Sequence, residues 1–287
     1  MYTILDPSCP GTEPGYTAWS GVRYAADPRK ELAEMVTIER ASEVFVHGFA
    51  FTRSLTHPCV AEPVGPDVWV LRDAPRAHGA PRVEEYVAYG VPAAALAALA
   101  RQHTHGRFRL CVIRTVRTSD DGIRADFQAL GYRLMTTESF MLHRLNAITP
   151  AVEPFPVRQV TTVEQARQLW KTARSRRIMS ERLMAEPAPT RQYMALDDGT
   201  PVGWVSSVVV GDCTWCTGMF VKPAYRRRGI ARALLTRMLG DDKAAGAKAS
   251  VLLASHAGSA HYPQVGYEQI GALLMFVPPK SATAGAI

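Results

Sequence analysis

The residue types and spacing best suited to chemistry lie in the segment KPAYRRRGIARALL, residues 222–235. Three arginines directly precede Gly229 and a run that is typical of a helix. The first turn of a helix leaves backbone N–H groups unpaired, and the helix dipole is positive at the same point. Arginines gathered there repel one another unless an anion is bound, and glycine lets the backbone approach that anion closely. We therefore expect this corner to bind a phosphate or diphosphate, with a solvated basic turn as the alternative.

The pattern of hydrophobic residues predicts the strands and helices that position this corner. We expect a strand at CTWCTGMFV (213–221), a helix from about 230 to 245 and a strand at ASVLLAS (249–255). A short helix around GSAHYPQVG (258–266) and strands in YEQIGALLMFVP (267–278) follow. The corner would thus join a strand to a helix, next to a second, parallel strand.

Capping and turn residues predict a helix and two strands in the segment before the corner. Thr162, with Gln165 three residues later, predicts the start of a helix, and Asp197, Asp198 and Gly199 predict a turn between two strands. Hairpins combined with strand–helix–strand units indicate an α/β fold class, with a mixed sheet and helices on both faces.

The sequence also contains an internal repeat. Residues 146–157, NAITPAVEPFPV, hold three prolines and are typical of a linker. DFQALGYRLMTTESFMLHRL (126–145) aligns with HYPQVGYEQIGALLMFV (261–277), each with an aromatic residue, Gly-Tyr and an expected amphipathic hairpin. The preceding strand, helix and strand match in the same order. We therefore predict two tandem domains, residues 1–148 and 149–287.

The two copies differ where chemistry is expected. In the first copy Val91 runs directly into Pro92, so the arginine loop is missing. Phe127 stands in the first copy where the second has Tyr262, so a phenolic hydroxyl is missing too. The differences predict that only the second copy has a working site.

Composition limits the classes of partner. The 287 residues suit two domains, and 47% hydrophobic with 21% charged residues is ordinary for a globular protein. The formal charge of +7 favours an anionic partner, such as a nucleic acid, a membrane surface or a phosphate-bearing cofactor. The start of the chain lacks the pattern of a signal peptide and VPAAALAALA is too short to span a bilayer, so a cytoplasmic protein without membrane contact is expected.

The cysteines do not indicate a metal or redox site. Their number, five, is odd and argues against a disulfide framework. Cys213 and Cys216 lie three apart on an expected strand, so their side chains would face opposite sides as buried thiols. No second ligand pair follows at a zinc spacing, and we expect no metal.

MFVKPAYRRRGIARALL and HYPQVGY together resemble the GCN5-related N-acetyltransferase (GNAT) family. The family's acetyl-CoA motif, Arg/Gln-x-x-Gly-x-Gly/Ala, coincides with Arg226, Gly229 and Ala231. The resemblance implies that the strands at 213–221 and 249–255 splay apart to admit the pantetheine arm, as a peptide adds to a sheet edge. It implies cofactor-binding roles for Met219, Phe220, Val221, Arg226, Arg227, Arg228, Gly229, Ile230 and Ala231.

The resemblance further implies direct transfer of an acetyl group to an amine. A backbone N–H near Phe220 would polarise the thioester carbonyl, and Tyr262 would protonate the leaving thiolate, with packing as its alternative role. No general base is evident. Asp212, His256 and His261 are candidates, but a structural or solvent-facing role is the favoured interpretation of each, and water could serve instead. Arg174, Arg176 and Arg177 could assist with an acidic acceptor or the cofactor phosphates.

We therefore expect an acetyl-CoA-dependent N-acetyltransferase that acts on a small molecule or peptide. The first copy would act as a scaffold in a monomer (a pseudo-dimer) or a weak homodimer. Transfer from another acyl-CoA, a non-catalytic CoA-binding regulator and a basic nucleic-acid binder are the alternatives, and the compact arginine loop disfavours the last.

Overall fold

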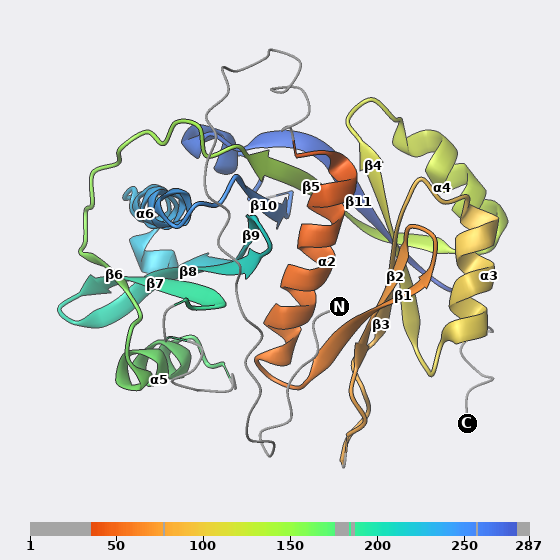
Figure 1. Cartoon of the computed structure of the whole chain (residues 1–287), viewed down its shortest axis with the longest axis horizontal. Helices are drawn as coiled ribbons and strands as arrows, with labels where there is room; N and C mark the ends of the chain where they lie inside the picture. Colours follow the sequence, from red (N-terminus) through yellow and green to blue (C-terminus); the bar gives the residue numbers. More distant parts are fainter. Residues whose placement is uncertain (1–35, 77, 176–183, 185–186, 257, 280–287) are drawn as a thin grey trace, which may run out of the picture. The chain divides into compact units, whose positions relative to one another are not determined.

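The computed structural model describes residues 36–76, 78–175, 184, 187–256 and 258–279, which contain one mixed sheet (Figure 1). Its 11 strands run in the order β1-β2-β3-β4-β11-β5-β10-β9-β8-β7-β6. The expected α/β class with a mixed sheet is confirmed. The strands are β1 (Cys59–Gly65), β2 (Val68–Asp73), β3 (Glu84–Tyr89), β4 (Phe108–Thr115), β5 (Arg133–His143), β6 (Val157–Gln159), β7 (Thr190–Asp197), β8 (Thr200–Val210), β9 (Cys213–Val221), β10 (Ala249–Ala254) and β11 (Glu268–Val277).

Helices cover both faces of this sheet. Clusters of buried side chains place α2 and α5 over one face and α3, α4 and α6 over the other. The capping box expected at Thr162 and Gln165 is present at the start of α5. The helices are α2 (Ile38–Ser54), α3 (Ala93–His103), α4 (Asp120–Ala129), α5 (Val163–Thr172) and α6 (Ile230–Ala244), with short 3-10 turns η2 (Pro223–Tyr225) and η3 (Tyr262–Val265).

Two groups of four strands have the same internal arrangement. In β1-β2-β3-β4 the pairings are antiparallel, antiparallel and parallel, and β7-β8-β9-β10 repeats that sequence of pairings. A helix joins each parallel pair, α3 in the first group and α6 in the second. From α2 to β5 and from α5 to β11 the order of strands and main helices is therefore similar, with the 3-10 turn η3 at the place of α4, whereas β6 has no counterpart among the described residues of the first half.

The strand that follows each group in the chain lies beside the other group. β11 pairs with β4, whereas β5 pairs with β10, and β5 and β11 pair with each other at the centre of the sheet (Figure 1). The hairpins expected in residues 126–145 and 267–278 are wrong, since each segment forms one long strand. An alternating pattern predicts a strand but does not say which strand it pairs with. The sequence therefore did not reveal that β5 and β11 each pair with the other group.

A buried carboxylate fixes α6 to the sheet. Asp242 is fully buried, accepts hydrogen bonds from the hydroxyls of Ser207 and Thr214 at 2.8 and 2.9 Å, and pairs with Arg191 at 2.8 Å. These partners lie on β7, β8 and β9. The network therefore holds the C-terminal end of the helix against three strands.

Asp242→Ala is expected to lower the free energy of unfolding by about 3–5 kcal/mol, because it leaves a buried arginine and two buried hydroxyls without their acceptor. Denaturant unfolding of both proteins measures the difference. The matched control is Asp241→Ala, because Asp241 is 30% exposed and pairs with Arg237 on the helix surface. That surface pair is worth about 0.5 kcal/mol. Equal losses in the two variants would contradict a special role for the buried network.

Candidate active site

The strands β9 and β10 are paired over only part of their length. Parallel pairing joins residues 213–215 of β9 to residues 249–251 of β10 and stops there. Trp204 of β8 is opposite Phe220, while Ser206 is opposite Thr217, so β9 contains an extra residue next to Gly218, whose φ is +67°. Such a bulge turns the strand away from its neighbour. Within the described chain, residues 216–221 thus have no strand partner on the β10 side.

The arginine corner follows directly at the end of β9. Arg227 and Gly229 have left-handed φ values of +60° and +81°, and Gly229 is the N-cap of α6. In the described part of the chain the backbone amides of residues 227–232 donate no hydrogen bond. Left-handed residues and a helix start gather these amides on one concave surface, which is the donor set that an anion requires.

Tyr225 fixes the loop before the helix. Its hydroxyl donates to Asp197 at 2.7 Å, its ring packs edge-on against Phe155, and the guanidinium of Arg228 lies 5.3 Å from its ring centre. Arg226 donates from Nε to the Val221 carbonyl at 3.2 Å. The loop is therefore held by contacts that leave its amides free.

A cavity of about 650 Å³ contains the free part of β9, the arginine corner and η3. Arg228 was expected among the residues that bind the cofactor, but it is not a lining residue, because its side chain turns to Tyr225. Ser255, Leu235 and Gln264 also line the cavity and were not expected, since nothing in their spacing marks them. The expected site residues that the cavity brings together are Met219, Phe220, Val221, Arg226, Arg227, Gly229, Ile230, Ala231 and Tyr262.

Tyr262 closes the cavity opposite β9. Its ring packs edge-on against Tyr267, with 5.6 Å between ring centres. Burial raises the pKa of the Tyr262 hydroxyl, and the neighbouring Cys216 thiol adds to the shift. The hydroxyl therefore keeps its proton throughout the neutral range and can donate it.

Of the three candidates for a general base, one lines the cavity and two do not. Asp212 lies at the far end of β9, where it pairs with Arg40 at 3.0 Å and Lys248 at 3.3 Å, and these hydrogen bonds lower the pKa of Asp212. His256 is exposed and is not a lining residue, whereas His261 lines the cavity as an exposed side chain. Arg174 is described, while Arg176 and Arg177 lie outside the described residues.

The thiols of the Cys-x-x-Cys pair are buried on opposite faces of β9, as expected. Cys213 belongs to the cluster under α2 and Cys216 to the cluster under α6. Burial raises the pKa of Cys213 to about 11 and of Cys216 to about 12, so both stay protonated and unreactive. Among the described residues no group of three His, Cys, Asp or Glu side chains could hold a metal ion.

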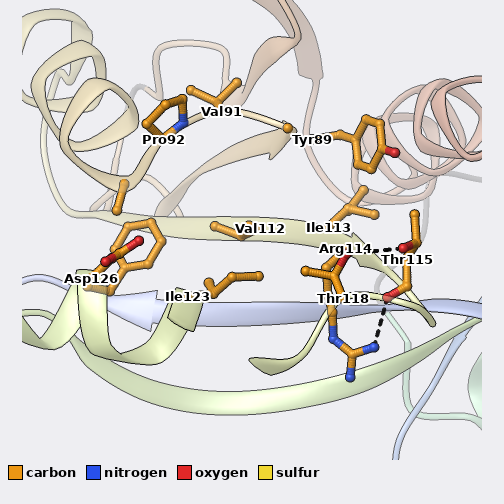
Figure 2. Close-up of a pocket in the computed structure, with 13 residues that line it drawn as sticks. Tyr89, Val91, Pro92, Val112, Ile113, Arg114, Thr115, Thr118, Ile123 and Asp126 are labelled. Atoms are coloured by element: carbon orange, nitrogen blue, oxygen red, sulfur yellow. Dashed lines mark hydrogen bonds between the residues drawn. The ribbon is translucent and has the colours of Figure 1, made fainter. Parts of the chain in front are cut away.

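The matching position in the first group of strands is built differently (Figure 2). There β3 and β4 pair over six residues, 84–89 with 108–113, so the strands do not separate. The cavity beside them measures about 240 Å³ and is lined by apolar side chains such as Val91, Val112 and Ile123 and by the polar side chains of Arg114, Thr115, Thr118 and Asp126 (Figure 2). Phe127 is 1% exposed and stacks on Phe276 at 4.2 Å, which makes it a core residue.

The larger cavity fits an acyl-CoA. Unbonded amides at residues 227–232 suit the diphosphate, the unpaired edge of β9 suits the amide-rich pantetheine arm, and Tyr262 lines the same cavity. When bound, the molecule would supply a thioester whose acyl carbon is open to attack. The residues of this chain would bind it, orient it and hold a proton at the Tyr262 hydroxyl.

No helix in the described chain is both long and apolar enough to cross a membrane.

Comparison with known proteins agrees with this geometry. No curated protein matches the chain in sequence. A GCN5-related N-acetyltransferase from Kribbella flavida has a TM-score of 0.59 at 14% identity, with 82% of this chain and 95% of that chain covered. A second such protein, from Sphaerobacter thermophilus, has a TM-score of 0.50 at 14% identity, covering 85% of this chain and 95% of that one. Residues 158–267 match the model of the Acetyltransferase (GNAT) family. The chain thus has the fold of the GCN5-related N-acetyltransferases, and its residues 158–267 are a domain of the GNAT family.

Proposed function

We propose that the protein transfers an acetyl group from acetyl-CoA to an amine of a small molecule or peptide. The observation that carries the proposal is the continuous cavity from the unpaired edge of β9 to the free amides at the start of α6. Backbone groups of Met219, Phe220 and Val221 would pair with the pantetheine arm. The free amides of residues 227–231, together with the side chains of Arg226 and Arg227, would hold the diphosphate, whereas the amide of Arg226 itself donates to the Pro223 carbonyl at 3.3 Å.

Two groups would act on the reacting atoms. A backbone N–H next to Phe220 would stabilise the charge that develops on the thioester oxygen, which is worth about 3–4 kcal/mol for one donor. Tyr262 would give its proton to the sulfur that leaves. The raised pKa of its hydroxyl keeps that proton available at neutral pH.

The proposed organisation is two domains, residues 1–148 and 149–287, of which the second alone carries the reaction. Full pairing of β3 with β4, the smaller cavity and the buried Phe127 support a scaffold role for the first domain. Through β5 it also completes the sheet of the second domain. A cytoplasmic monomer would be sufficient, since both groups of strands lie in one chain.

Calorimetric titration with acetyl-CoA is expected to give one binding site per chain, because only one strand pair opens. The matched test compares two substitutions, Gly229→Glu and Gly90→Glu. Gly90 has a φ of +70° and precedes α3, as Gly229 precedes α6. Gly229→Glu should weaken binding, whereas Gly90→Glu should leave the stoichiometry and affinity unchanged. Two equivalent sites, or equal effects of the two variants, would contradict the proposal.

A further inference from the structure

His143, the last residue of β5, is a buried histidine that the proposed reaction does not use. Its side chain is 3% exposed, and its Nδ1 atom accepts a hydrogen bond from the backbone amide of Leu145 at 2.9 Å. A ring nitrogen that accepts a hydrogen bond carries no proton, so we assign the proton of the neutral ring to Nε2. Nε2 is itself buried and, within the described chain, has no hydrogen-bond partner of good geometry. Such a group is rare in the core of a folded protein.

The Nε2 atom lies against the end of η3. A Cβ built on Gly266, the residue that closes η3, would stand 2.6 Å from Nε2. Gly266 has a φ of +96°, and its amide donates to the Pro263 carbonyl at 3.1 Å. Glycine therefore meets two requirements here, a left-handed backbone and room for the imidazole. The His143 ring thus packs directly on the turn that carries Tyr262.

Aromatic rings extend this contact to the cavity of the second half. The His143 ring packs edge-on against Tyr267 with 5.3 Å between ring centres, and Tyr267 packs in the same way against Tyr262. Tyr262, Gln264 and Val265 of η3 line the cavity, whereas His143 does not. His143 belongs to the first half of the chain, so it can act on a molecule in the cavity only through η3.

The bond to Leu145 depends on the neutral ring. Leu145 is 3% exposed and has a φ of +56°, a left-handed conformation that is uncommon for a residue with a side chain. Nδ1 satisfies the amide of this buried residue, and a protonated imidazole has no acceptor to offer. Protonation of His143 would set two N–H donors against each other and add a buried charge. The position of the ring against η3 is therefore maintained only while the ring is neutral.

The surroundings of His143 favour the neutral ring. Burial lowers the pKa of His143 below its ordinary value of 6.5, against the Val265 backbone and the Glu268 carboxylate, which favour the charged ring, while Lys243 adds to the lowering. Glu268 is 68% exposed and lies 3.9 Å from Arg144, so solvent weakens its effect. His143 thus becomes charged only as the pH falls below 6.5. Three further titratable groups in this part of the core stay uncharged at neutral and acid pH, because their pKa values are raised: Tyr262, Tyr267 and Cys216.

We propose that His143 is a positioning residue for the cavity of the second half: its neutral ring holds η3 and Tyr262 at the cavity wall, and its protonation releases them and weakens acetyl-CoA binding. This inference rests on the proposed function and adds control of the same site by pH, through a residue that the first half supplies. The coupling is reciprocal, so bound acetyl-CoA in turn opposes protonation of His143.

Calorimetric titration of the full chain with acetyl-CoA at pH 7.5 and pH 5.5 tests the proposal. The dissociation constant of wild type should rise about tenfold at the lower pH, the scale of one lost buried hydrogen bond. His143→Phe keeps a ring but offers no acceptor to Leu145, so it should bind about tenfold more weakly than wild type already at pH 7.5. His143→Asn supplies a carbonyl oxygen in place of Nδ1 that does not titrate. It should rescue most of the binding at pH 7.5 and lose most of the rise at pH 5.5.

A second measurement follows Tyr262 without any ligand. NMR spectra of the full chain with isotope-labelled tyrosine, assigned with the help of Tyr262→Phe, should show the Tyr262 ring signal moving with a midpoint below pH 6.5. The same signal should not move in His143→Asn. The ring of Tyr132, buried beside Phe127 in the first half, is the internal reference and should stay in place. A general loss of stability would instead change both ring signals together.

His105→Asn is the matched control, because His105 is an exposed histidine of the first half and the substitution is the same. It should leave the affinity and its pH dependence as in wild type. An equal pH dependence in wild type and His143→Asn, or a Tyr262 signal that does not respond to acid, would overturn this inference and leave the proposed function standing. If wild type binds no acetyl-CoA at either pH, the proposed function fails, while the NMR titration still decides whether His143 positions Tyr262.

Discussion

Gly229→Glu is expected to raise the KM for acetyl-CoA by about 100-fold. A unit charge about 4 Å from another contributes roughly 4 kcal/mol at an effective dielectric constant of 20, and screening at an exposed corner reduces this to about 2.7 kcal/mol. Each 1.4 kcal/mol is a tenfold change in affinity. The new carboxylate would stand among the amides that we assign to the diphosphate, so repulsion opposes binding directly.

Gly229→Ala separates charge from backbone strain. Gly229 has a φ of +81°, and a Cβ there would meet nothing nearer than Pro154 at 4.0 Å. Alanine therefore introduces the conformational cost of a left-handed residue, about 1–2 kcal/mol, without a clash or a charge. Initial rates over a range of acetyl-CoA concentrations, with thermal melts of each variant, distinguish the effect of the charge from that of the backbone strain. A similar KM for Ala and Glu would argue against an anion site at this corner.

Tyr262→Phe is expected to lower kcat by about 10²- to 10⁴-fold, the usual contribution of a positioned general acid. The affinity for acetyl-CoA should stay within twofold, since phenylalanine keeps the ring and its contact with Tyr267. Because the pKa of Tyr262 is raised, its loss of a proton should not shape the rate profile between pH 6 and 9. Steady-state rates combined with calorimetry measure both quantities.

Tyr267→Phe is the matched control. Its hydroxyl is buried and lies 2.8 Å from the Ser250 hydroxyl, and Tyr267 does not line the cavity. Losing that hydrogen bond should cost about 1–3 kcal/mol of stability and leave kcat close to wild type. A loss of kcat and affinity in parallel for Tyr262→Phe would indicate that Tyr262 only packs.

Local signals in the sequence predicted the elements around the site well. The turn at Asp198 and Gly199, the capping box at Thr162 and the limits of α6 each depend on neighbouring residues, and all three are present. The corner at Gly229 was predicted for the same reason, since a strand, a cationic loop and a helix start follow one another in the chain. Its assignment to acetyl-CoA stays a prediction.

Features that depend on distant contacts were not predicted. The bulge at Gly218 is defined by pairing with β8; a glycine inside the strand CTWCTGMFV can mark a bulge, but the sequence does not name the strand it pairs with. The position of His143 depends on which strands β5 joins, and a strand pattern does not name its partners. Arg228 lies over the Tyr225 ring, a contact that composition does not determine, and its role toward an anion stays a prediction.

The placement of β5 and β11 makes the strands of one half of the chain depend on the other half. Deleting residues 1–148 would take β5 from β10 and would take both neighbours, β4 and β5, from β11, which leaves strand edges open to aggregation. We propose a scaffold role for residues 1–148, and these pairings give that scaffold a definite task, since β10 and β11 depend on strands that it supplies.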